Sequence, residues 1–382
     1  MNDAPELDVA MVAGETSGDL LASLVIPGMQ LRWPGLRMSG IGGPRMQGLG
    51  FTSWWPMEKL SVRGYVEVLK HYREIVGIRK QIKSRLLSQR PDIFIGIDAP
   101  DFNLDLARDL RQSGLKTVQF VCPSVWAWRA ERMQNIRRSV DHVLCLFPFE
   151  PTLLAKQGID ATFVGHPLAN VIPEHADSLL ARQQLGVKPE DRLLAILPGS
   201  RKDEVIQMLP RFLAAVKLLQ AQFPDLITAL PVAPGMAELV NSIVGHYSNL
   251  KNLKVISGQS HTVMAAANVA MVTSGTATLE AALFKCPMVI AYAMPWLSWQ
   301  IIHRKRLQPW VGLPNILCQD FVVPELLQSR ATPELLAHAV SDWFEQPDKV
   351  DALRKTFEHL HQSLRADTAT VTTNAIAKIL EA

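Results

Sequence analysis

Residues 269–280 read Val269-Ala270-Met271-Val272-Thr273-Ser274-Gly275-Thr276-Ala277-Thr278-Leu279-Glu280. The apolar start predicts a buried strand and the end predicts a helix, so Ser274, Gly275 and Thr276 form the turn between them. A helix N-terminus exposes backbone N–H groups and carries partial positive charge, which favours a phosphate. Glu280 follows Thr276 by one helical turn, where its carboxylate can accept hydrogen bonds from ribose hydroxyls. The alternative is an ordinary strand-to-helix turn capped by Ser or Thr.

A second turn of the same kind follows the apolar run Leu193–Leu197. It reads Pro198-Gly199-Ser200-Arg201 and leads into another helical segment. The planar guanidinium of Arg201 suits bidentate contact with phosphate, although a single arginine in a polar loop is often only a surface residue. Two such turns, one with a base and one with an acid, predict a site for a nucleotide diphosphate, held partly by Ser200 and Arg201. The sequence contains no G-x-x-x-x-G-K-[ST] loop, so a P-loop site is excluded.

The composition predicts a folded protein of two domains. The chain has 382 residues, 48% of them hydrophobic and 20% charged, which is typical of globular proteins. The net charge of +3 gives no indication of nucleic-acid binding. The four cysteines are widely spaced, which argues against a disulfide framework or a zinc site and favours a reducing cytosol. We expect no signal peptide and no membrane span, because the start is polar and no apolar run is long enough.

Strand-like runs alternate with helical stretches along the whole chain, which predicts an α/β fold with parallel sheets. Two such sets predict two doubly wound, Rossmann-like domains facing a cleft. We expect them at residues 1–168 and 169–350, with a helical segment at 351–382 that packs back on either domain. The predicted strands are Val9–Ala13, Arg37–Ile41, Ile93–Ile97, Thr117–Val121, His142–Leu146, Thr162–Val164, Leu193–Leu197, Ile227–Leu230, Lys254–Ile256, Val269–Val272 and Met288–Tyr292.

A carboxylate, Asp98, stands where the apolar strand Ile93–Ile97 ends. Open α/β sheets bind ligands at the carboxyl ends of their strands, and Pro100 can open the next helix. Asp98 is therefore a candidate general base that takes a proton from a hydroxyl nucleophile, or else it bonds local backbone N–H groups. Ser17 and Gly18 lie in a similar turn after the first strand, where an acceptor molecule can approach the backbone or the chain simply turns.

Two tryptophans and a basic segment follow the next predicted strand. Trp126 and Trp128 are separated by one residue, and Arg129 opens a basic stretch. Indole rings beside a cleft stack on sugars, but large aromatic residues are more often core. The basic stretch is either a solvated face or a site for an anionic acceptor.

An apolar series at helical spacing lies between residues 62 and 78, surrounded by basic residues up to Arg85. An apolar face with basic flanks is typical of a helix that lies on an anionic membrane. A helix packed on the core gives the same periodicity, so both interpretations stay open. The predicted membrane or acyl-chain patch consists of Val66, Val68, Leu69, Tyr72, Ile75 and Val76.

Five segments, taken together and in this order, resemble the lipid A disaccharide synthases of Gram-negative bacteria. They are Gly14-Glu15-Thr16-Ser17-Gly18-Asp19, Gly96-Ile97-Asp98-Ala99-Pro100-Asp101-Phe102-Asn103, Pro123-Ser124-Val125-Trp126-Ala127-Trp128-Arg129, Leu197-Pro198-Gly199-Ser200-Arg201 and Ser274-Gly275-Thr276-Ala277-Thr278-Leu279-Glu280. The resemblance runs from about residue 8 to about residue 365 and leaves no major gap.

This resemblance implies an inverting glycosyltransferase of the GT-B type. It implies UDP-2,3-diacylglucosamine as donor, 2,3-diacylglucosamine 1-phosphate as acceptor, and UDP and a β-1,6-linked disaccharide as products. It also implies that Asp98 is the general base and that Arg201, Glu280 and Asn315 belong to the donor site. The enzyme would act at the cytoplasmic face of the inner membrane, bound to it peripherally. Because we find no D-x-D pair at a strand end, we expect neither a metal nor another cofactor.

Three alternatives remain at this point. A UDP-N-acetylglucosamine 2-epimerase shares the architecture and the nucleotide site but needs no lipid surface. A glycosyltransferase acting on a peptidoglycan lipid precursor shares both the nucleotide site and a membrane patch. A non-catalytic lipid-binding or nucleotide-binding protein also fits, because a fold does not fix a function. The sequence leaves open whether the chain forms a homodimer.

Overall fold

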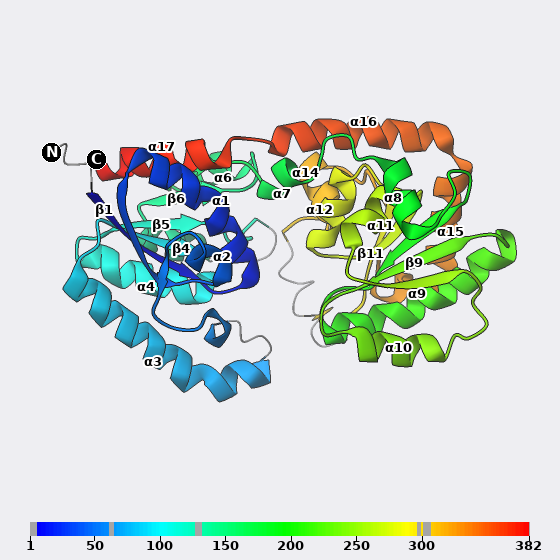
Figure 1. Ribbon diagram of the computed structural model, residues 1–382, viewed down its shortest axis with the longest axis horizontal. Helices are drawn as coiled ribbons and strands as arrows, with labels where there is room; N and C mark the ends of the chain where they lie inside the picture. Colours follow the sequence, from blue (N-terminus) through cyan, green and yellow to red (C-terminus); the bar gives the residue numbers. More distant parts are fainter. Residues whose placement is uncertain (1–5, 61–64, 127–131, 296–298, 301–306, 382) are drawn as a thin grey trace. The chain divides into compact units, whose positions relative to one another are not determined.

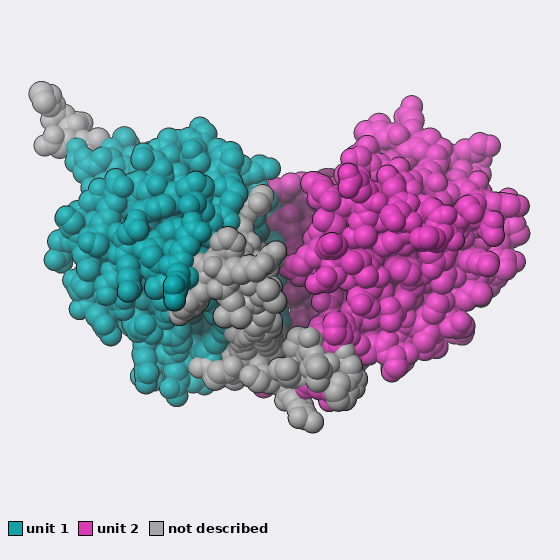
Figure 2. Space-filling model, turned by 90° about the horizontal axis from the view of Figure 1, so that it is seen from below, with its two compact units in different colours: residues 1–167, 364–382 teal, residues 168–363 magenta. Residues whose placement is uncertain are grey.

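The computed structural model describes residues 6–60, 65–126, 132–295, 299–300 and 307–381, and leaves the side chains of residues 16 and 65–72 undescribed. The chain divides into two compact units, coloured separately in Figure 2. Unit 1 comprises residues 1–167 and 364–382, and unit 2 comprises residues 168–363. Each unit contains one parallel β-sheet with helices on both faces, so the predicted pair of doubly wound Rossmann-like domains is confirmed.

The sheet of unit 1 has seven strands in the order β3-β2-β1-β4-β5-β6-β7. The strand order therefore reverses between β1 and β4, the neighbouring central strands. The strands are β1 (Glu6–Ala13), β2 (Gly35–Ile41), β3 (Thr52–Ser53), β4 (Ile93–Ile97), β5 (Lys116–Phe120), β6 (His142–Cys145) and β7 (Ala161–Phe163). In a doubly wound sheet, ligands bind beyond the carboxyl ends of the strands at this reversal.

Helices of unit 1 cover both faces of its sheet. The helices α1 and α17 lie together on one face, and α3 and α4 lie on the other (Figure 1). The close approach of α1 to α17 depends on Gly28, where a Cβ atom would lie 3.0 Å from the side chain of Ala369. The helices are α1 (Thr16–Arg32), α2 (Pro44–Gln47), α3 (Tyr65–Gln89), α4 (Pro100–Gln112), α5 (Arg132–Ser139), α6 (Glu150–Ala155) and α17 (Thr368–Glu381), with a 3-10 turn at Met57–Lys59.

The sheet of unit 2 repeats this arrangement with six strands in the order β10-β9-β8-β11-β12-β13, and reverses between β8 and β11. Both central strands are buried along their whole length. The strands are β8 (Leu193–Leu197), β9 (Ile227–Val232), β10 (Leu253–Ser257), β11 (Val269–Thr273), β12 (Met288–Tyr292) and β13 (Glu325–Leu327). The helices are α7 (Pro167–Val171), α8 (Ser178–Leu185), α9 (Lys202–Gln222), α10 (Ala237–Gly245), α11 (Ser260–Ala266), α12 (Thr276–Leu283), α14 (Leu313–Cys318), α15 (Pro333–Glu345) and α16 (Pro347–Leu364), with a 3-10 turn at Gln328–Arg330.

The structure divides the expected C-terminal segment 351–382 between the two units. Helix α16 lies in unit 2 up to Ser363, whereas α17 belongs to unit 1. Within unit 2, the buried His361 of α16 donates from Nε2 to the carbonyl of Ala169, 2.8 Å away. The segment is thus divided between the two units. The apolar periodicity of the sequence cannot show this division, because α16 and α17 have similar apolar faces.

All eleven predicted strands are present, with ends that differ by at most a few residues. The sequence analysis missed β3 and β13, at the outer edge of each sheet. Both are only two or three residues long, so neither has enough alternating residues to give a pattern.

Candidate donor and acceptor sites

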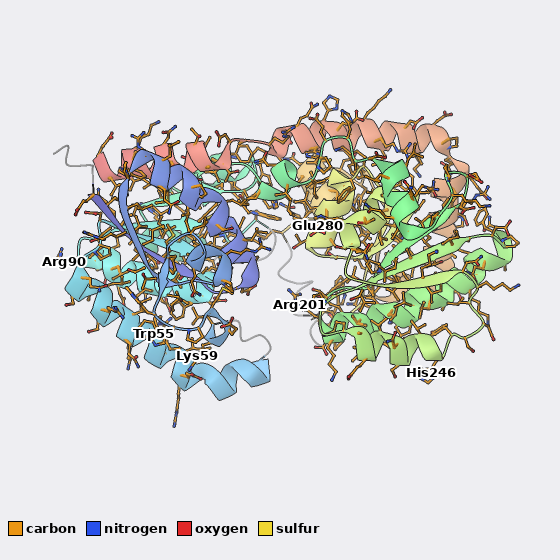
Figure 3. All side chains as sticks on the ribbon, viewed as in Figure 1. Trp55, Lys59, Arg90, Arg201, His246 and Glu280 are labelled. Atoms are coloured by element: carbon orange, nitrogen blue, oxygen red, sulfur yellow. The ribbon has the colours of Figure 1, made fainter. Side chains whose placement is uncertain are left out.

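The two glycine-bearing turns of unit 2 follow β8 and β11, the strands between which the sheet order reverses. They line one cavity of about 320 Å³ together with residues after β9 and β10. Arg201 comes to this cavity from the start of α9, and Glu280 from the second turn of α12. Figure 3 labels both side chains on one edge of unit 2. Parallel strands bring the two turns together, although about 70 residues separate them in sequence.

Arg201 is held by a carboxylate that the sequence analysis did not single out. Its guanidinium donates to Glu204 Oε1 at 2.7 Å, and Oε2 of the same carboxylate accepts from the backbone N–H groups of Ser200 and Arg201 at 3.2 and 3.3 Å. Gly199 has a φ of +107°, and a Cβ there would lie 2.5 Å from Glu204. A glycine is therefore required for this turn. The signal in the sequence was the acidic residue three positions after the helix N-cap.

Glu280 also has a polar neighbour within unit 2. His261 Nε2 lies 3.4 Å from Glu280 Oε2, and its ring contacts Phe284 edge-on at 5.2 Å between ring centres. The carboxylate of Glu280 is only 20% exposed, so it is directed toward the cavity and this histidine. Glu280 is the only carboxylate besides Glu204 among the described residues that line the cavity.

Ser274, Gly275 and Thr276 line the same cavity at the N-terminus of α12. The Ser274 hydroxyl donates to the carbonyl of Val311 at 3.4 Å, which connects this turn to the segment that precedes α14. The predicted donor-site residues Ser200, Arg201 and Glu280 therefore line the same cavity of unit 2 as the turn Ser274-Gly275-Thr276.

Asn315, which the resemblance assigns to the donor site, does not line this cavity. Its side chain is completely buried, and its amide bonds both the N–H and the carbonyl of Val323 and the carboxylate of Glu325. Glu325 in turn accepts from the backbone N–H groups of Val311 and Gly312. Asn315 therefore positions the segment that Ser274 contacts. The sequence resemblance placed it near the site but could not show that its amide points into the protein.

Asp98 lies at the reversal of strand order in unit 1, directly after β4. Its φ is +53° and that of the next residue, Ala99, is +40°, a left-handed conformation that L-residues rarely adopt. Two buried amides hold this backbone, because Asn103 Nδ2 and Gln119 Nε2 both donate to the carbonyl of Asp98, at 2.9 and 3.1 Å. Gly96 makes room for Asn103, since a Cβ there would lie 2.7 Å from it. Backbone strain of this kind often occurs at functional sites.

The Asp98 carboxylate has a hydroxyl partner from the first turn of the unit. Ser17 Oγ donates to Asp98 Oδ2 at 3.3 Å, which brings the turns after β1 and β4 together. Gly14 allows this approach, because a Cβ atom on it would lie 2.6 Å from the side chain of Ala99. The expectation that the turn holding Ser17 and Gly18 adjoins the acceptor site fits this geometry.

A cavity of about 180 Å³ opens beside Asp98. Its walls come from Val121 and the residues after β5, and from Arg132 at the start of α5. Val121 has a φ of +78°, which is strained for a β-branched residue. The Arg132 guanidinium donates to Asp101. The sequence analysis did not select Arg132, because it sits in a stretch of several similar arginines.

Of the two interpretations of Trp126, sugar stacking or core, the structure shows core. Its indole is buried, packs edge-on against Phe147 and Phe149, and donates from Nε1 to Glu150 Oε1 at 2.9 Å. Glu150 also accepts from the N–H of Phe147 at 3.0 Å, and its burial raises its pKa to about 7. Trp126 thus holds the loop beside the Asp98 cavity in place. Trp128 and Arg129 lie outside the described residues.

The expected membrane helix exists as α3, and its second half packs on unit 1. Ile78, Ile82 and Leu86 are buried. Arg79 and Lys83 bind Asp105 and Asp109 of α4 at 2.7 and 2.8 Å, so these two cations serve the fold rather than an anionic surface. Of the predicted patch, Ile75 and Val76 are half-buried. The side chains of Val66, Val68, Leu69 and Tyr72 lie outside the description.

No group of three or more His, Cys, Asp or Glu side chains among the described residues could hold a metal ion. None of the helices within the described ranges is both long and apolar enough to cross a membrane.

Comparison with known proteins identifies the family. The model of the family described as Lipid-A-disaccharide synthetase matches residues 9–379. A lipid-A-disaccharide synthase of Albidiferax ferrireducens is 56% identical over 380 residues, which is 98% of each chain. One from Paraburkholderia xenovorans is 48% identical over 377 residues, 98% of this chain and 97% of its own length. This chain belongs to the lipid-A-disaccharide synthase family. It is therefore a glycosyltransferase of lipid A biosynthesis, as the resemblance implied.

Solved structures agree on the fold. The MnaA protein of S. aureus, solved with UDP, matches with a TM-score of 0.67 at 9% identity over 98% of this chain and 97% of that one. The MurG protein of Acinetobacter baumannii matches with a TM-score of 0.61 at 14% identity over 98% of this chain and 100% of that one. At these identities the likeness concerns the fold alone. The family match, rather than the fold, is what disfavours the alternatives of an epimerase or a peptidoglycan-precursor glycosyltransferase.

Proposed function

We propose that this protein condenses UDP-2,3-diacylglucosamine with 2,3-diacylglucosamine 1-phosphate, giving the β-1,6-linked disaccharide 1-phosphate and UDP. The binding of the donor is supported by a cavity in unit 2 that Arg201, Glu280 and the N-termini of α9 and α12 line together. A diphosphate needs hydrogen-bond donors and positive charge, and a ribose needs an acceptor for its hydroxyls. This cavity offers all of these.

Asp98 acts as the general base on the acceptor. It removes the proton of the 6-hydroxyl as that oxygen attacks C1 of the donor sugar. The bond from C1 to the β-phosphate oxygen breaks, and UDP leaves with the electron pair. Direct displacement inverts C1, from an α-linked donor to a β-linked product. Ser17, which donates to Asp98, orients the carboxylate and leaves its other oxygen for the substrate hydroxyl.

The departing UDP carries negative charge that the protein stabilises without a metal ion or another cofactor. The N–H groups at the start of α12 and the guanidinium of Arg201 supply this stabilisation, because both are fixed before the reaction begins. Glu204 contributes by holding Arg201 and the Gly199 turn in one conformation.

Both substrates carry acyl chains, so the enzyme works at the surface of a bilayer, the cytoplasmic face of the inner membrane. The first half of α3 is the proposed docking element, since its second half is tied to α4 by Arg79 and Lys83. Each aliphatic side chain buried in lipid contributes about 1.5–3 kcal/mol, and each basic residue near anionic lipid about 1 kcal/mol. These sums support reversible attachment.

The test is a product assay with the purified full chain in mixed micelles. UDP-2,3-diacylglucosamine and the acceptor phosphate should give UDP and a β-1,6-linked disaccharide in equal amounts. UDP-N-acetylglucosamine supplied alone should remain unchanged, whereas its conversion to the 2-epimer would support the epimerase. Absence of the disaccharide with both acylated substrates present would refute the proposal.

A further inference from the structure

In the proposed reaction, the cavity beside Asp98 must accommodate two negatively charged groups, the carboxylate of Asp98 and the phosphate of the acceptor. A general base must be ionised, so Asp98 contributes a negative charge to the cavity. The proposed acceptor carries a phosphate monoester with a charge of about −1.5 to −2 near neutral pH. Two anionic groups in one small cavity repel each other unless a cation lies between or beside them.

Arg132 is the only Lys or Arg among the described residues that line this cavity. It begins α5, and its side chain is only 19% exposed, so the fold restricts its conformations. A guanidinium presents several N–H donors in one plane and binds phosphate oxygens in pairs. The exposed Ser124 adds a hydroxyl on the same wall.

One described partner of Arg132 lies at the protein surface. Arg132 donates to Asp101, whose side chain is 83% exposed. Because Asp101 is exposed, water can solvate its carboxylate when a phosphate shares the guanidinium. A guanidinium has five N–H donors, so Arg132 can bind phosphate oxygens in the cavity that it lines in addition to its contact with Asp101.

We propose that Arg132 binds the 1-phosphate of the acceptor and thereby selects the phosphorylated monosaccharide. This inference rests on the proposed function and adds a specificity-determining residue to it. The phosphate anchors one end of the sugar at Arg132 while the hydroxyl at the other end meets Asp98. Both residues line the same cavity, so one monosaccharide spans them.

The experiment varies the enzyme and the substrate together. We measure kcat/KM for the acceptor with its 1-phosphate and for 2,3-diacylglucosamine without it, in the native protein and in Arg132→Gln. The native protein should prefer the phosphorylated acceptor, and Arg132→Gln should reduce that preference roughly 10- to 100-fold, chiefly through KM. The affinity for UDP, measured by calorimetry, should not change, because unit 2 holds the donor cavity.

Three further variants keep the result interpretable. Arg138→Gln removes an exposed cation from the same helix and should leave the preference at the native value. Arg132→Lys keeps the charge and should retain part of the preference. Asp101→Asn removes the competing carboxylate and should keep or increase the preference, which also serves as the test if Arg132→Gln does not fold.

An unchanged preference in Arg132→Gln, or its loss in Asp101→Asn, would overturn the inference. Equal loss of activity on both acceptors in Arg132→Gln would make Arg132 a structural residue and also overturn it. These outcomes differ from a failure of the proposed function, in which the native protein forms no disaccharide at all.

Discussion

Replacement of Arg201 by alanine gives the clearest prediction for the donor site. The guanidinium is the one strong cation that the described residues bring to the 320 Å³ cavity of unit 2. A charge-assisted contact to phosphate contributes about 1.5–3 kcal/mol. Because the Arg201 side chain is 60% exposed, water screens part of this contribution. We therefore expect a loss of about 2 kcal/mol, which raises the Kd for UDP about 30-fold.

The contact between Glu204 and Arg201 allows a second test of the same prediction. In Arg201→Ala its carboxylate keeps the two backbone N–H groups but loses its cation, so an unbalanced negative charge stays beside the diphosphate. Adding Glu204→Gln to Arg201→Ala should therefore recover part of the lost affinity. In a double-mutant cycle the two changes should be strongly non-additive, because the two side chains touch at 2.7 Å.

The assay is titration calorimetry with UDP alone, so it does not depend on lipid substrates. Arg211→Ala is the matched control, since Arg211 lies on the same helix and bonds only the Gln207 carbonyl in the described contacts. Its affinity for UDP should equal that of the native protein. Unchanged affinity in both Arg201→Ala and Glu280→Ala would refute the reasoning and place the nucleotide elsewhere.

Three more predictions concern stability, the membrane and metal ions. Burial raises the pKa of Glu150 from 4.5 to about 7, so the unfolded chain ionises first as pH rises. The free energy of unfolding should therefore fall by about 3 kcal/mol between pH 4.5 and 7 and then level off, and Glu150→Gln should lack this fall in denaturant titrations. The triple variant Val66→Ser, Val68→Ser, Leu69→Ser should stay folded and bind UDP, yet lose sedimentation with anionic vesicles, whereas Ile78→Ser, at a buried position of the same helix, should lower Tm. Unfolding of the triple variant would mean that the face is core. Activity should survive EDTA, and a strict requirement for added divalent metal would contradict the metal-free leaving-group step.

The sequence predicted the fold because buried parallel strands give long apolar runs that turn residues interrupt. Ile93–Ile97 and Leu193–Leu197 are examples, since every residue in both strands is buried. The rule that ligands bind at strand ends then selected Asp98, and the phosphate-binding character of the two strand-to-helix turns selected Arg201 and Glu280. The places of these residues follow from the topology of the parallel sheets, and the alternation of strands and helices in the sequence largely determines that topology.

The sequence could not predict whether a side chain near a site points toward the cavity or into the protein. Asn315 and Trp126 lie near the predicted sites in the chain, yet both point into the protein, where they bond the carboxylates of Glu325 and Glu150. Glu204 and Arg132 were passed over for a related reason, because an acid or base in a polar stretch usually only faces solvent. Only the tertiary arrangement shows that one holds Arg201 and that the other lines the Asp98 cavity.

The role of Asp98 is tested most directly by the turnover of Asp98→Asn with both acylated substrates. Asparagine keeps the size of the side chain and can still accept from Ser17, but it cannot take a proton. We expect kcat to fall on the order of a hundredfold or more, with UDP affinity and Tm unchanged. Turnover by Asp98→Asn at a near-native rate would contradict the account, because another group would then have to be the base.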